Sequence, residues 1–166
     1  MRHPVLLSIS CPAGIAAALA GRQLQNVMDD STIFTARDAW LANPTAAEAT
    51  YGHISTWKTG KVTDMSELFC GSSSLCEYYN SAALFFNDDI SAWDTSGVTT
   101  MHRMFLYASA FNQDIGDWAV HSVTTMFAML EGASAFDQDL NWCVDNDVNL
   151  DEAFSGTPCE STSCGV

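Results

Sequence analysis

The stretch FNDDISAWDTSGVTTMHRMFLYASA, residues 86–110, is followed at once by a second version of itself, FNQDIGDWAVHSVTTMFAMLEGASA, residues 111–135. The two are identical at 13 of 25 positions. A third copy opens at Phe136 with FDQDLNWCV and then loses the pattern. Self-similarity at a fixed period of this length is typical of a solenoid, in which each unit buries its apolar side only by stacking on its neighbours. The sequence therefore indicates an architecture more clearly than an activity.

Apolar residues recur within each copy at a helical spacing. Met101, Met104, Phe105 and Ala108 fall at i, i+3, i+4 and i+7, and the same spacing starts again at Met126. This pattern predicts a two-turn helix. Upstream, an Ile and a Trp three residues apart predict a very short or bent strand. We therefore expect an α/β fold, a solenoid of about three 25-residue strand-turn-helix coils, right-handed by the general preference of strand-helix-strand crossovers.

The first copy begins near residue 51, and its slots are offset from the next by 36 residues instead of 25. The 11 extra residues lie within 70–85, CGSSSLCEYYNSAALF. We expect the recurring side chains to fill the inside of the coils. These core positions are Ile54, Trp57, Val62, Met65, Ile90, Trp93, Val98, Met101, Met104, Phe105, Ile115, Trp118, Val123, Met126 and Met129.

These repeats resemble the BspA-type leucine-rich-repeat family of microbial surface proteins, whose units carry an FNQDI, W, VT, M and MF pattern. The resemblance is carried by FNQDI at 111–115 with Trp118, by VT at 123–124 with Met126, and by WDTS at 93–96 with VT at 98–99, and it covers roughly residues 51–154. It implies a leucine-rich-repeat-like fold and a non-catalytic protein, secreted or displayed on a surface, that contacts other molecules. The common L-x-x-L-x-L-x-x-N motif is absent, so that motif's binding surface is not carried over.

The two ends of the chain differ from the repeats in composition and residue pattern. Residues 1–20 have a basic start, an apolar stretch and a small-residue end, and they predict a cleavable secretory signal with a mature start at Gly21. Residues 21–50 predict a helical N-terminal cap, in which Asp30 or Ser31 begins a helix that Asn43 and Pro44 end. The repeat array then spans 51–154, and residues 155–166 form a C-terminal cap or tail.

The charge balance excludes several classes of partner. The chain has 20 acidic and 6 basic residues, a net charge of −14. Such a surface repels phosphate backbones and anionic membranes, so we expect no nucleic-acid partner. No segment is long and apolar enough for a membrane span. We expect a monomer outside the cell or on its surface, with an extracellular protein or glycan as partner.

The insertion at 70–85 is the most individual part of the sequence. A disulfide between Cys70 and Cys76 would close a small loop and hold Tyr78 and Tyr79 near its tip. Exposed aromatic residues on a rigid scaffold favour a contact site, and the alternative is that the tyrosines pack on the edge of the coil. The polar turn between Trp93 and Val98, with Asp94 and Thr95, completes the predicted partner-binding surface.

Six cysteines in a chain of this size favour an oxidising compartment. At the C-terminal end we prefer a pair between Cys143 and Cys159, which would fasten the tail across the last coil. A pair between Cys159 and Cys164 is the alternative. A zinc site is a poor fit, because no two cysteines have the spacing of a ligand knuckle.

Stacking would also bring together Asp89, Asp114 and Asp139, which occupy equivalent positions. Three carboxylates in a column could share calcium, which would make the chain a calcium-dependent glycan-binding protein. The alternative is that each carboxylate caps the turn of its own coil. No nucleophile elbow, phosphate loop or metalloprotease motif appears, so no catalytic activity and no cofactor other than this calcium are expected. A third hypothesis is a structural spacer.

Overall fold

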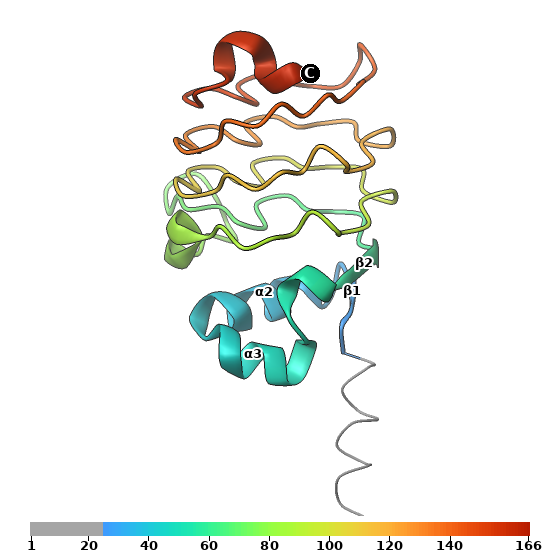
Figure 1. The fold of residues 1–166 in the computed structure, drawn as a ribbon, viewed down its shortest axis with the longest axis vertical. Coiled ribbons are helices and arrows are strands. Elements are labelled where there is room, and N and C mark those ends of the chain that lie inside the picture. The colour runs from blue at the N-terminus through green and yellow to red at the C-terminus, as the bar shows by residue number, and fades with distance from the viewer. Residues whose placement is uncertain (1–24) are drawn as a thin grey trace, which may run out of the picture.

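The computed structural model describes residues 25–166. The expected signal over 1–20 and the cleavage before Gly21 lie outside the described residues. Two helices, α2 (Ile33–Ala42) and α3 (Pro44–Tyr51), precede the repeats, and two strands, β1 (Val27–Asp29) and β2 (Lys58–Lys61), pair in parallel. Figure 1 shows this helical part at one end of the molecule and a stack of turn-rich layers extending away from it toward the C-terminus.

The break between the two helices follows from residues 43 and 44. Asn43 has an extended backbone, as expected for a residue before proline, and this ends α2. Its side-chain oxygen accepts a hydrogen bond from the N–H of Ala46, while Pro44 occupies the first turn of α3.

The prediction that Asp30 or Ser31 caps the first helix is wrong, because Thr32 occupies the N-cap position. Asp30 instead accepts hydrogen bonds from Thr63, so it joins the N-terminal part to the first layer.

The prediction of an α/β solenoid of strand-turn-helix coils is wrong. In the described residues, α2 and α3 are the α-helices, and both precede the repeats. Beyond β2 the regular elements are two 3₁₀-helices, Ser81–Phe85 (η2) and Glu160–Gly165 (η3), while a third, Ile54–Thr56 (η1), precedes β2. The repeat segments expected to be helices are successions of turns, and the single sheet of the described residues has two strands.

Hydrogen bonds between the copies explain why the helices do not form. The N–H of Arg103 donates to the carbonyl of Phe127, 2.9 Å away, and that of Phe105 donates to Met129 at 2.7 Å. The N–H groups between them close turns instead, as Met104 does to Met101. Arg103 also has a φ of 53°, outside the helical region. Alternate amides are therefore used between copies, and no continuous i→i−4 ladder remains.

The prediction of a short strand in each copy is also wrong, because hydrogen bonds close these segments into turns. The N–H of Trp93 donates to the carbonyl of Ile90 at 3.1 Å, and Trp118 does the same to Ile115 at 3.1 Å. These bonds join residues three apart, so each segment is a turn. It places both apolar side chains inside without any strand.

The copies nevertheless lie one on another in a constant register (Figure 1). Isolated parallel bridges join Asp64, Thr100, Thr125 and Asn149 in sequence. The indole rings of Trp93 and Trp118 are parallel within 3°, with centroids 6.4 Å apart. Each indole N–H donates to a carbonyl of the preceding copy, as Trp118 does to Ile90 at 3.2 Å. All the core positions proposed above are buried.

Candidate functional site

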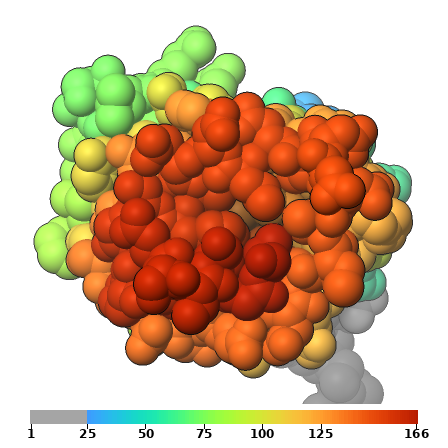
Figure 2. Space-filling model, turned by 90° about the horizontal axis from the view of Figure 1, so that it is seen from above, coloured from blue at the N-terminus to red at the C-terminus, as the bar shows by residue number. Residues whose placement is uncertain are grey.

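The insertion within 70–85 projects sideways from the stack of repeats. It contains a disulfide between Cys70 and Cys76. In Figure 2, which looks along the stack, its green atoms project beyond the orange and red layers at one side. The segment is long enough to make its own surface, and the bridge closes its first part.

Several contacts hold the insertion against the rest of the protein. The Arg37 guanidinium, buried under the segment, donates to the carbonyls of Leu68 at 2.6 Å and Tyr78 at 3.2 Å. A carboxylate oxygen of Glu67 accepts hydrogen bonds from the N–H groups of Glu77 and Tyr78. Arg103 donates to the carbonyl of Leu75 at 2.6 Å. The backbone of the insertion is thus attached to α2 and to two copies of the repeat.

Large apolar side chains are exposed on this segment. In residues 25–166, six such side chains are exposed, and four of them belong to the insertion. Tyr78 is 51%, Tyr79 41% and Phe85 79% exposed. We call these four the insertion surface; they are Leu75, Tyr78, Tyr79 and Phe85. The other two are Val27 and Tyr107.

Tyr78 combines the two arrangements considered from the sequence. Its ring packs against Phe34 of α2, with centroids 4.8 Å apart, while half of the residue stays accessible. Both residues line a hollow of ≈350 Å³, and the acidic residues Asp30, Asp64, Glu67 and Glu77 line it as well. Aromatic faces beside negative charge suit an incoming Lys or Arg side chain.

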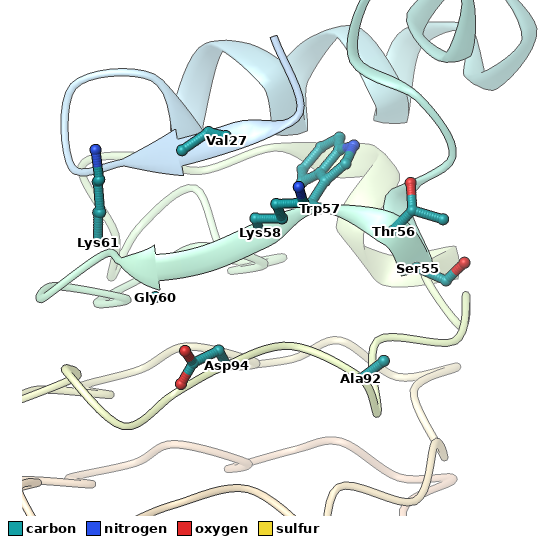
Figure 3. A pocket seen from close by; sticks show the side chains of 9 residues that line it. All are labelled: Val27, Ser55, Thr56, Trp57, Lys58, Gly60, Lys61, Ala92 and Asp94. Carbon is teal, nitrogen blue, oxygen red and sulfur yellow. The ribbon is translucent and has the colours of Figure 1, made fainter. Parts of the chain in front are cut away.

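The two polar-turn residues predicted to bind a partner have different surroundings. Asp94 is exposed and lines a groove of ≈550 Å³ beside β2 (Figure 3). Hydrogen bonds from the hydroxyl and the N–H of Ser96 hold the pKa of Asp94 below its usual value of 3.8. Thr95 is buried, and its hydroxyl donates to the carbonyl of Ala119. Asp94 is therefore available to a ligand, whereas Thr95 joins two layers.

Two of the three stacked aspartates, Asp89 and Asp114, accept hydrogen bonds within their own turns. A carboxylate oxygen of Asp89 accepts hydrogen bonds from the N–H and hydroxyl of Ser91, and Asp114 accepts one from the N–H of Gly116. Asp139 lies against the C-terminal turn, close to Gly165. In the part of the chain that the structure describes, no three His, Cys, Asp or Glu side chains gather as a metal site would require.

The C-terminal disulfide is not the one that we preferred from the sequence. Cys159 is joined to Cys164, with Cα atoms 4.8 Å apart, and Cys143 is exposed and unpaired. The expected Cys143–Cys159 bridge is therefore wrong, and the alternative pairing is the one formed. The turn from 159 to 164 brings its own two ends together, so the bridge closes the tail on itself.

Sequence reasoning missed residues whose role depends on folding. Arg37 contacts the insertion across 41 positions, and no local pattern marks it. Phe85 and its buried neighbour Phe86 are adjacent identical residues after the stretch SAAL, and only the structure shows which of the two is exposed. Lys58 and Lys61, which line the groove beside Asp94, could have been noticed as the only lysines in the chain.

Comparison with known families matches residues 41–163 to the model described as "Mycoplasma protein of unknown function, DUF285". The chain belongs to this family. No curated protein and no solved structure matches it. Within residues 25–166, none of the helices has the length and apolar character needed to cross a bilayer.

Proposed function

We propose that this member of the DUF285 family is a non-catalytic protein, secreted or held on the cell surface, that mediates adhesion or another contact with an extracellular protein or glycan. The observation that carries the proposal is the concentration of exposed large apolar side chains on one anchored segment. Solvent-exposed aromatic residues of this kind are the usual energetic centres of protein interfaces.

The anchoring of the insertion favours binding. A loop that is already ordered loses less conformational entropy when a partner docks. Here the Cys70–Cys76 bridge and the bonds from Arg37 and Arg103 hold the backbone, while the side chains of Tyr79 and Phe85 remain accessible. The insertion surface is therefore organised before any partner arrives.

Two further features support the extracellular setting. Two disulfides are stable where the compartment is oxidising. The FNQDI and VTTM patterns resemble the BspA-type leucine-rich-repeat proteins of microbial surfaces, for which contact with other molecules is the expected role. The acidic, aromatic hollow beside Tyr78 favours a partner that presents a basic side chain there.

The test compares adhesion of beads that carry equal densities of the protein to epithelial monolayers and to immobilised extracellular-matrix proteins. Replacing both Tyr79→Ser and Phe85→Ser should lower the apparent affinity by about 1000-fold, since two interface anchors at about 2 kcal/mol each contribute about 4 kcal/mol together. Tyr107→Ser, which removes an exposed apolar side chain that belongs neither to the insertion surface nor to the groove beside β2, is the matched control and should bind normally. If the unaltered protein, the double variant and the control variant adhere equally, or if none of them adheres, the spacer hypothesis would be favoured.

A further inference from the structure

Within residues 25–166, the groove beside β2 brings together two positively charged side chains of this acidic chain. Lys58 and Lys61, the only two lysines of the sequence, both line it. The described residues hold one ion pair, between Arg37 and Asp38, so neither lysine is paired there. Figure 3 shows both lysines extending from β2, with Val27 on β1 to one side and Asp94 on the next layer to the other.

Asp94 adds an acceptor to the same groove. One of its oxygens receives both hydrogen bonds from Ser96, and the other, Oδ2, faces β2 at Gly60. A Cβ atom at position 60 would lie 2.5 Å from that oxygen, so glycine is what permits the approach. The oxygen is left to accept a hydrogen bond from a ligand. With its carboxylate ionised, the three charges of the groove sum to about +1.

We propose that this groove binds the carboxylated sugar residue of an acidic glycan. The positive charges of Lys58 and Lys61 attract the ligand's carboxylate, and one of the ligand's hydroxyl groups donates to Asp94 Oδ2. Its apolar C–H face lies against Val27 and Ala92, which also line the groove. A single positive charge favours a monoanion over a phosphate dianion, and a hydroxyl-rich ligand satisfies Asp94 where a second carboxylate would be repelled.

This site is separate from the insertion surface. In Figure 1, β2 and the insertion that ends in η2 lie at different sides of the stack. No residue of the insertion surface lines the groove. The inference therefore concerns a second site and goes beyond the proposed function. The groove can fail to bind a glycan while the insertion surface still binds its partner, and the reverse also holds.

The test titrates the full chain, labelled with ¹⁵N, with glucuronate and with N-acetylneuraminate while the amide signals of residues 58–61 are followed. Saturable shifts with a dissociation constant on the order of millimolar are expected, as for a single sugar with few contacts. Lys58→Gln and Lys61→Gln should each weaken binding about fivefold, the effect of one exposed ion pair. Gly60→Ala should weaken it as well, by displacing Asp94.

Two control variants and one control ligand separate the effect of charge from that of the site. Ser161→Glu adds the same negative increment at an exposed position in the C-terminal turn and should leave binding unchanged. Lys61→Arg retains the charge and should bind within about twofold of the unaltered protein. Neutral glucose should not shift these amides.

Several results would overturn the proposal. These are equal binding of glucose and glucuronate, no saturable shift from either acidic sugar, or unchanged affinity in the Lys58→Gln, Lys61→Gln double variant. Tighter binding of inorganic phosphate or of a tetraglutamate peptide at the same amides would assign the groove to another class of anion.

Discussion

Replacing Phe111 with alanine should remove a large part of the folding free energy. The residue is fully buried. Its ring lies 3.9 Å from that of Phe105, 6.0 Å from Phe86 and 5.8 Å from Phe136, measured between centroids, and all four rings are nearly parallel. It thus joins three copies of the repeat, and its removal leaves a cavity that the stacked backbone closes only in part.

The expected loss is about 4–5 kcal/mol, the upper part of the range for Phe→Ala in a core, because three aromatic pairs are lost with the buried area. A domain of this size has a stability of about 5–15 kcal/mol. The melting temperature should fall by about 8–20 °C. Phe85→Ala is the matched control, since that ring is 79% exposed, and it should change stability by no more than about 0.5 kcal/mol.

Urea unfolding of the oxidised chain, followed by circular dichroism and tryptophan fluorescence, gives the loss of unfolding free energy for Phe111→Ala and for Phe85→Ala. Agreement between the two signals is needed before a single free energy is assigned. A difference of less than about 1.5 kcal/mol between the two variants would refute the stacked aromatic core, since a simple large-to-small core substitution costs more than that.

Three other perturbations test separate parts of the structure. Trp118→Phe retains the ring stack but orphans the buried carbonyl of Ile90, and it should cost about 1–3 kcal/mol in the same urea experiment. Replacing Cys70 and Cys76 with serine should raise hydrogen exchange at residues 72–79, since closing so short a loop restrains it by about 2 kcal/mol, and should leave exchange at residues 126–132 unchanged. Hydrogen bonds from Ser91 hold the pKa of Asp89 in the folded protein below its usual value of 3.8. The ionised carboxylate therefore stabilises the fold fully above pH 3.8, and this stabilisation is lost as the pH falls through the lowered pKa of the folded state. Asp89→Asn should flatten this part of a plot of unfolding free energy against pH.

The repeat period and the buried positions could be predicted because they depend on apolar side chains alone. Met101, Met104 and Phe105 are buried, as a helical spacing suggests. Their backbone is not helical, because stacked turns bury the same positions while alternate amides bond to the next copy. The positive φ of Arg103 carries no signal in the sequence, where glycine or asparagine would have marked it.

The candidate site was predictable where a local feature marks it. The offset of 36 against 25 residues located the insertion, and Cys70 and Cys76 within it suggested the bridge that the structure contains. The contacts that hold it come from Arg37, which is distant in sequence. The partner of Cys159 depends on the path of the tail, which spacing alone does not determine.

The most direct test of the central claim is photo-cross-linking from the insertion surface on intact cells. A benzophenone side chain replaces Tyr79 in one protein and exposed Ser161 in a second, and the products after irradiation are identified by mass spectrometry. The proposal predicts a dominant adduct from position 79 that is absent from position 161 and is lost when Phe85→Ser is added. Identical adducts from both positions, or an adduct at 79 that Phe85→Ser leaves unchanged, would contradict the claim that the insertion surface makes the contact.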